Sequence, residues 1–190
     1  MSKFDLLIFD FDGTLVNSIP PAVEAIAEML KKLGYPEKSH EEINKHVGYG
    51  ERALVAGSIC SEDEQEINKA KEVYFKLYCE RLKHIPLYPH VEETLKTLKN
   101  KTMSIISNKN DDFIAIILKN RKLDKLFSDI IGGENSYPLK PDPFTVNMLR
   151  QKHKMSRQQT LFIGDMTIDV ETGKNAGVAT CAAAYGFDAK

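Results

Sequence analysis

Residues 4–14 have the sequence FDLLIFDFDGT, in which a run of apolar side chains ends at two aspartates and a glycine. The nearly continuous apolar run at residues 4–9 is typical of a strand that is covered on both faces, as the strands of a parallel sheet are. Asp10 and Asp12 follow where this strand ends, and Gly13 permits a sharp turn of the backbone. Because aspartate and glycine are also common turn residues, this stretch alone indicates a turn and a site equally well.

The rest of the chain repeats this pattern of a short apolar run beside a helix-like segment. Strand-like runs occur at residues 103–106, 129–131, 161–163 and, more weakly, 178–184. Helix-like segments occur at residues 91–98, 112–118, 143–153 and 167–176. Such alternation predicts the α/β class with a doubly wound, Rossmann-like parallel sheet, in which ligands bind at the carboxyl ends of the strands.

A long stretch after the first strand departs from this alternation, because it contains helix-like segments only. These segments are residues 21–33, 41–47, 52–59 and 62–83. Capping boxes, in which a serine hydroxyl and a glutamate carboxylate satisfy free backbone N–H groups, are predicted at Ser39 with Glu42 and at Ser61 with Glu64. We therefore expect an all-α domain of residues 15–86, inserted into an α/β core of residues 1–14 and 87–190.

The composition favours a globular protein with a small-molecule partner. The chain has 190 residues, of which 42% are hydrophobic, with 26 basic and 27 acidic side chains. This balance favours neither nucleic acid nor an anionic membrane as a partner. The apolar run near the N-terminus is too short for a signal peptide or a membrane span, and the three cysteines are too far apart to indicate a disulfide framework or a zinc site. These features predict a cytoplasmic protein.

A second pair of aspartates follows a later strand. Asp165 comes directly after the apolar run 161–163, and Asp169 lies one helical turn further on. Because both aspartate pairs follow predicted strands, a doubly wound sheet would bring four carboxylates to one edge. Carboxylates this close repel one another and need a cation, and hard oxygen ligands suit Mg²⁺. A helix cap at Asp165 and a solvated side chain at Asp169 are the alternative.

Donors suited to a phosphate lie near two other predicted elements. Ser107 and Asn108 follow the apolar run 103–106, and Lys140 precedes the predicted helix 143–153. Hydroxyl, amide and ammonium groups placed at that edge of the sheet can bind phosphoryl oxygens. For each residue taken alone, a turn or cap serine and a surface lysine are the alternatives.

Four motifs occur along the chain in this order: DFDGT beginning at Asp10, SN at Ser107, KP at Lys140, and GDMTID, which contains Asp165 and Asp169. By these motifs, which together span nearly the whole chain, the protein resembles the haloacid-dehalogenase (HAD) superfamily. The inserted residues 15–86 resemble the α-helical cap domain of that superfamily.

The resemblance implies a phosphatase mechanism in which Asp10 is the nucleophile and becomes an aspartyl phosphate, while Asp12 acts as general acid and base. It also implies a Mg²⁺ ion held by Asp10, the backbone carbonyl of Asp12, Asp165 and Asp169, the last directly or through water. The implied phosphate-binding residues are Gly13, Thr14, Ser107, Asn108 and Lys140.

Within the superfamily, secondary motifs resemble those of the phosphoglycolate phosphatases. They are VNS at residues 16–18, VGYG at 47–50, SNK at 107–109, IGGE at 131–134 and YGF at 185–187. The resemblance implies phosphoglycolate as the substrate, with Arg52 either binding its carboxylate or being an ordinary surface arginine. Asn17 and Met166 depart from the pattern, which usually has an acidic residue and a small or hydroxylated residue at these positions, so another small phosphate is also consistent.

Other functions fit the same core motifs. They are a β-phosphoglucomutase-like phosphomutase, an inorganic pyrophosphatase or other small-phosphate phosphatase, and a noncatalytic binding module of the same fold. The cap decides whether water or a sugar hydroxyl accepts the phosphoryl group, and a binding module normally lacks the nucleophile or a metal ligand, which this chain retains. We expect a small phosphorylated metabolite as the partner, and a monomer or a homodimer.

Overall fold

The computed structural model of the chain describes residues 3–134 and 136–187. In this part of the chain, five parallel strands form one sheet in the order β3-β2-β1-β4-β5. The strands are β1 (Leu6–Phe9), β2 (Thr102–Ile106), β3 (Asp129–Ile131), β4 (Thr160–Gly164) and β5 (Ala179–Ala182). The strand order reverses beside β1, which confirms the predicted doubly wound α/β class.

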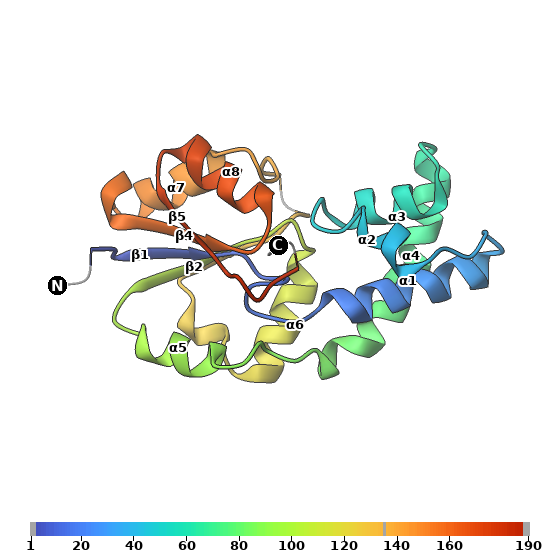
Figure 1. Ribbon diagram of the computed structural model, residues 1–190, viewed down its shortest axis with the longest axis horizontal. Helices are drawn as coiled ribbons and strands as arrows, with labels where there is room; N and C mark the ends of the chain where they lie inside the picture. The colour runs from blue at the N-terminus through green and yellow to red at the C-terminus, as the bar shows by residue number, and fades with distance from the viewer. Residues whose placement is uncertain (1–2, 135, 188–190) are drawn as a thin grey trace.

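Helices cover both faces of the sheet. Helices α5 (Val91–Thr97) and α6 (Asp111–Arg121) lie below it in Figure 1, and α7 (Phe144–Lys152) and α8 (Thr167–Ala176) lie above it. The alternation of side chains along β1 divides the interior accordingly, since Leu7 and Phe9 belong to the larger apolar core and Leu6 and Ile8 to the smaller one. The uninterrupted apolar sequence of β1 therefore contributes side chains to both cores.

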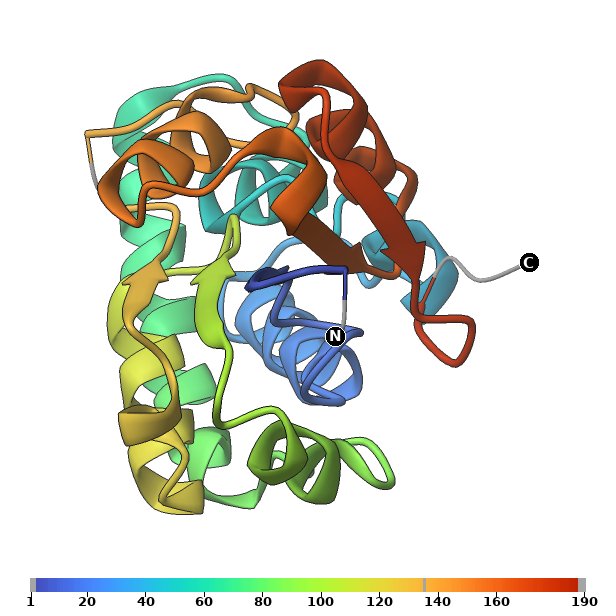
Figure 2. The ribbon, with the colours of Figure 1, turned by 90° about the vertical axis from the view of Figure 1, so that its left-hand side faces the viewer.

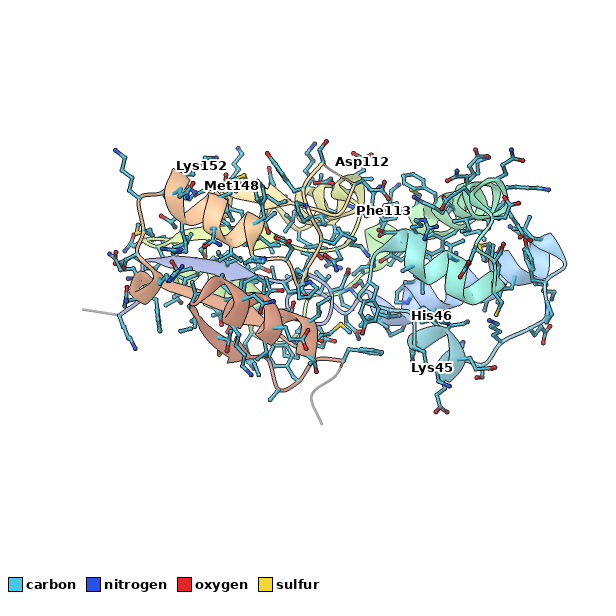
Figure 3. All side chains as sticks on the ribbon, turned by 90° about the horizontal axis from the view of Figure 1, so that it is seen from above. Lys45, His46, Asp112, Phe113, Met148 and Lys152 are labelled. Carbon is cyan, nitrogen blue, oxygen red and sulfur yellow. The ribbon has the colours of Figure 1, made fainter. Side chains whose placement is uncertain are left out.

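The remaining helices form a separate layer beyond the carboxyl ends of the strands, and we call residues 19–84 the helical segment. It contains α1 (Ile19–Leu33), α2 (His40–Asn44), α3 (Glu51–Ile59), α4 (Glu64–Arg81) and the 3₁₀ turn η1 (Leu82–His84). Two further 3₁₀ turns, η2 (Asp124–Leu126) and η3 (Arg157–Gln159), lie among the other described residues, which we call the sheet-bearing part. Seen from above, Met148 and Lys152 of α7 lie toward the sheet end of the molecule, and Lys45 and His46 lie in the helical end (Figure 3).

Local sequence explains where α1 begins and ends. Pro20 and Pro21 occupy its first turn, where the backbone N–H groups have no helical partner. Gly34 follows its last residue with φ of 76°, a left-handed conformation that glycine adopts at little cost. Its apolar side chains, from Ile19 to Leu30, are buried against α4 and the core.

One of the two predicted capping boxes is wrong. Ser39 and Glu42 form the expected reciprocal pair at the start of α2. At the start of α4, however, the capping residue is Asp63, whose side chain accepts hydrogen bonds from the backbone N–H groups of Gln65 and Glu66. Ser61 instead accepts a hydrogen bond from the N–H of Asp63. The helix therefore starts two residues later than predicted, because Asp63 caps N–H groups further along the chain than Ser61 would.

The chain leaves the sheet and returns to it along two adjacent segments. Val16 on the outgoing segment bridges Leu87 on the returning one. The N–H of Asn17 donates to the carbonyl of Pro86 at 2.9 Å, and the N–H of Tyr88 donates to the carbonyl of Leu15 at 3.1 Å. The larger apolar core is also continuous from the sheet into α1 and α4. The helical segment is thus held to the strand ends by both backbone pairing and apolar contact. Figure 2 views the molecule from the sheet end, with the helical segment behind the sheet.

None of the helices in residues 3–134 and 136–187 has both the length and the apolar character that a membrane span requires.

The smaller core provides a test of the fold. Phe162 on β4 is 1% exposed within it, so Phe162→Ala should lower the free energy of unfolding by about 3–5 kcal/mol. Phe144→Ala is the matched control, since Phe144 is 47% exposed and its loss should cost less than about 1 kcal/mol. Equilibrium urea unfolding followed by circular dichroism measures both values, and equal losses would contradict the assignment of Phe162 to the core.

Candidate active site

Three aspartates from different elements meet at the carboxyl edge of the sheet. Asp10 follows β1, Asp165 follows β4, and Asp169 lies in the first turn of α8. All three are buried, and one carboxylate oxygen of each lies within 4.8 Å of those of the other two. Because β1 and β4 are neighbours in the sheet, their ends carry the two aspartate motifs to the same point. The sequence predicted four carboxylates at this edge, and the structure groups three of them, with the Asp12 carboxylate outside the group.

A lysine ammonium lies among these carboxylates. The Nζ atom of Lys140 is 2.8 Å from Oδ1 of Asp10 and 2.6 Å from Oδ1 of Asp169. Asn108 fixes the backbone of this lysine, since its Oδ1 accepts from the Lys140 N–H at 2.9 Å and its Nδ2 donates to the Lys140 carbonyl at 3.4 Å. Lys140 is therefore held in a defined position rather than being a surface lysine.

The cluster carries more negative than positive charge. Burial and the neighbouring charge of Asp169 raise the pKa of Asp10 to about 8, although Lys140 opposes this effect. Burial also raises the pKa of Asp165, against hydrogen bonds from the Phe187 N–H and the Thr14 hydroxyl. Three carboxylates and one ammonium leave an excess of negative charge in a buried site, and oxygen ligands so placed fit a divalent cation.

Gly13 and Thr14 lie against Asp165. The Thr14 hydroxyl donates to Oδ1 of Asp165 at 2.8 Å. Gly13 has φ of 81°, and a Cβ atom there would come within 2.2 Å of Oδ2 of Asp165. The structure therefore brings these two residues against the carboxylate cluster, and neither is among the residues that line the adjoining cavity.

A small cavity of about 50 Å³ lies between the strand ends and the helical segment. The sheet-bearing part contributes Asp10, Asp12, Ser107, Asn108, Lys109, Lys140 and Met166 to its wall. Ser18, which directly precedes α1, and the helical segment form the rest of the wall; the residues of the helical segment are Ile19, Ala22, Val47, Gly48, Gly50, Glu51, Leu54 and Tyr74. The cavity thus adjoins the carboxylate cluster through Asp10 and Lys140, and both parts of the molecule enclose it.

Asp12 lies on the cavity side of the cluster and has two partners of its own. The Ser18 hydroxyl donates to its Oδ1 atom. The Nζ atom of Lys109 lies 3.1 Å from the same oxygen. Asp12 is therefore held by a set of contacts different from those of Asp10, although only one residue separates the two in sequence.

Lys109 is a site residue to which the sequence assigned no role. Its side chain is 5% exposed, and Nζ lies 4.6 Å from the centre of the Tyr78 ring. Burial alone would lower the pKa of Lys109, but the negative charges of Asp12 and Glu51 outweigh burial and raise this pKa well above its ordinary value. The residue belongs to the SNK motif, yet lysine is usually exposed, so nothing in its type predicted this burial.

The loop at residues 48–50 faces the site through Gly48 and Gly50, but Arg52 does not. Gly48 accepts a hydrogen bond at 3.0 Å from Nδ2 of Asn108. Arg52 is 56% exposed in its side chain and forms an ion pair with Glu64, outside the cavity wall. The adjacent Glu51 lines the cavity instead, because successive residues of a helix point in directions about 100° apart.

Glu51 joins the helical segment to the core. Its two carboxylate oxygens accept hydrogen bonds from the backbone N–H of Asn110 at 3.1 and 3.0 Å. Burial raises the pKa of this carboxylate, while Lys109 and the Asn110 N–H oppose that effect. Nothing in the sequence indicated that Glu51, and not the adjacent Arg52, would be the buried residue.

The sequence of this chain is similar to those of known hydrolases. The sequence model of the haloacid dehalogenase-like hydrolases matches residues 7–183. The phosphoglycolate phosphatase of Pseudomonas syringae pv. tomato is 35% identical over 191 residues, which cover 96% of this chain and 70% of that protein. The phosphoglycolate phosphatase of Vibrio parahaemolyticus is 35% identical over 195 residues, covering 96% of this chain and 85% of the relative.

Solved structures have the same architecture. A crystal structure described as a predicted phosphoglycolate phosphatase from Haemophilus somnus superposes with a TM-score of 0.92 at 32% identity, covering 98% of this chain and 88% of the other. A haloacid dehalogenase-like family hydrolase from Streptococcus pneumoniae superposes with a TM-score of 0.83 at 23% identity, covering 98% of this chain and 88% of the other, and shows the shared fold. The chain belongs to the haloacid dehalogenase-like hydrolase family.

Proposed function

We propose that the protein is a phosphatase that hydrolyses a small phosphate monoester, phosphoglycolate in the first instance, through an aspartyl phosphate on Asp10. The observation that carries this proposal is the position of Asp10, which belongs to the carboxylate cluster and also lines the cavity beside Asp12. This position supports a nucleophile, a proton donor and a cation site around one small space. The names of the similar relatives agree with this activity.

In the proposed first step, a carboxylate oxygen of Asp10 attacks phosphorus while the bond between phosphorus and the leaving oxygen breaks. Asp12 gives its proton to that leaving oxygen, so the product departs as a neutral alcohol. In the second step, Asp12 takes a proton from a water molecule, which attacks the aspartyl phosphate and releases inorganic phosphate. Asp10 is then regenerated, and Asp12 again carries the proton that the next cycle needs.

The surrounding groups hold the phosphoryl oxygens and balance charge. Ser107 lines the cavity, and Lys140 lies beside Asp10, which supports a role for both in binding phosphoryl oxygens. Asn108 acts through Lys140, whose backbone it binds. We propose that Asp10, Asp165, Asp169 and the backbone carbonyl of Asp12 hold Mg²⁺, which when bound supplies positive charge between carboxylate and phosphate.

The size of the cavity supports a small leaving group. A space of about 50 Å³ is small for any phosphate ester, and a small monoester such as phosphoglycolate would displace the helical segment less than a hexose phosphate would. This favours phosphoglycolate over a phosphomutase reaction on a hexose phosphate. Residues 15–86 would then act as a cap domain that closes over the substrate, and we propose the cytoplasm as the compartment.

A phosphate-release screen tests the substrate. With Mg²⁺, kcat/KM for phosphoglycolate should exceed that for hexose phosphates and nucleoside monophosphates by at least about 100-fold, because larger leaving groups would displace the helical segment further from the small cavity. Inorganic pyrophosphate belongs in the same screen, as does interconversion of hexose phosphates without phosphate release. Preferred hydrolysis of pyrophosphate, or isomerisation of a sugar phosphate, would overturn the substrate proposal.

Removing the nucleophile tests the covalent step. Asp10→Asn should reduce phosphate release by at least about 1,000-fold, because the amide is a poor nucleophile, while circular dichroism shows the fold unchanged. Asp63→Asn is the matched control, since Asp63 is an exposed helix cap and asparagine caps equally well. Substantial Mg²⁺-dependent activity in Asp10→Asn would remove Asp10 from its proposed role.

The raised pKa of Asp10 makes the stability of the metal-free protein depend on pH. Between the ordinary pKa of about 4 and the folded value of about 8, the folded state retains a proton that the unfolded state has released, so stability falls as pH rises. Asp10→Asn removes this effect. In EDTA, the free energy of unfolding of Asp10→Asn minus that of wild type should therefore rise by ~2–4 kcal/mol from pH 5 to pH 8.

Mg²⁺ should reverse this difference, because it binds the ionised carboxylates. Addition of Mg²⁺ at pH 8 should raise the thermal unfolding temperature of wild type and raise that of Asp10→Asn by clearly less. Thermal unfolding with and without EDTA at both pH values measures these effects. A stability difference between the two proteins that does not change with pH or with Mg²⁺ would contradict the assignment of Asp10 to a cation site.

A further inference from the structure

Lys109 has no part in the mechanism above, although it is a charged side chain buried in the wall of the cavity. We propose that Lys109 is a positioning residue, which holds the Asp12 carboxylate in the orientation that proton transfer to the leaving group requires. This inference rests on the proposed phosphatase function. It assigns the chain a second lysine that the reaction needs, distinct from Lys140 in both place and task.

The contacts of Asp12 show which of its oxygens is held. Both the Lys109 ammonium, at 3.1 Å, and the Ser18 hydroxyl meet Oδ1. Two contacts to one oxygen restrain rotation of the carboxylate and leave Oδ2 to carry the transferred proton. Lys140 cannot take over this task, because its Nζ lies between Asp10 and Asp169.

Lys109 is itself held from several directions. The Tyr78 ring from α4 lies 4.6 Å from Nζ, and the Phe113 ring from α6 lies 5.7 Å away. Glu51 of α3 binds the N–H of Asn110, the next residue along, and its negative charge also acts on Lys109. Figure 3 shows Phe113 near the junction of the two halves of the molecule. The ammonium therefore has little freedom to leave Asp12.

The charge of Lys109 suits the proposed acid step. When Asp12 gives up its proton, its carboxylate becomes negative in a partly buried place, and an ammonium already at 3.1 Å stabilises that charge without rearranging. Tyr78 and Glu51 belong to the helical segment, whereas Lys109 and Asp12 belong to the sheet-bearing part. The proton donor is thus completed only where the helical segment packs on the strand ends.

The test compares two substrates that differ in their need for a proton donor. An alkyl phosphate such as phosphoglycolate leaves as an alcohol and needs protonation, whereas acetyl phosphate is similarly small and leaves as a stable carboxylate. Lys109→Met, which removes the charge, should lower kcat/KM for phosphoglycolate by about 100-fold or more and that for acetyl phosphate by less than about tenfold. If another small alkyl phosphate is the better wild-type substrate, it replaces phosphoglycolate.

Two further variants separate positioning from a structural role. Lys71 forms an ion pair with Glu134, with 3.2 Å between Nζ and Oε1, which also joins the helical segment to the sheet-bearing part but does not involve Asp12. Lys71→Met should therefore leave the ratio of the two kcat/KM values as in wild type. In an Asp12→Asn background, Lys109→Met should cause little further loss on the alkyl phosphate, because the group that it positions is already absent.

The outcomes are distinct. Equal losses on both substrates, or a full further loss in the Asp12→Asn background, would overturn the positioning role while the phosphatase function stands. Absence of phosphate release from every monoester by wild type would overturn the proposed function itself, and this inference with it. Should Lys109→Met fail to fold, as judged by circular dichroism, Lys109→Gln provides the same comparison, since it keeps a polar group in the buried position and also lacks the charge.

Discussion

The ammonium of Lys140 lies between the carboxylates of Asp10 and Asp169, and the arrangement of the strand ends depends on this buried ion cluster. Charged groups lose favourable hydration when they are buried, and three carboxylates repel one another at these distances. A single lysine offsets part of that cost. The part of the cost that the lysine does not offset raises the pKa of Asp10, and a bound cation would offset it further.

This cluster also restricts which residues can occupy the positions around it. Gly13 lacks a Cβ because Asp165 lies against it, and Thr14 donates to the same carboxylate. Asn108 binds the backbone of Lys140 from one side and Gly48 of the helical segment from the other. The ion cluster is thereby connected to the cavity wall, so a shift of the helical segment would be transmitted to the lysine through a single side chain.

The two acid groups of the DFDGT motif have different surroundings, and this separates their chemistry. Asp10 is fully buried among other carboxylates, whereas Asp12 is only partly buried and meets the positive charge of Lys109. Environments of this kind allow one aspartate to act as a nucleophile and its neighbour to transfer protons. The sequence spacing alone places the two near each other, but it does not say which cations reach them.

Apolar periodicity and turn residues were enough to predict the five strands, the helices within a few residues and the doubly wound sheet, because these depend on local patterns of burial. The convergence of Asp10, Asp165 and Asp169 could also be predicted, since parallel strands bring their carboxyl ends to one edge. The start of α4 was predicted two residues too early, because both Ser61 and Asp63 are good capping residues and the sequence alone does not choose between them.

What the sequence by itself determined was therefore the fold class and the aspartates of the candidate site, which follow from local hydrophobic patterns and from the geometry of parallel strands. What only the tertiary structure decided was the cavity wall. Whether Glu51 or Arg52 turns inward, and whether Lys109 is buried, depends on how the helical segment packs against the strand ends. Those contacts join residues far apart in the chain, and charged side chains carry no local signal of such burial.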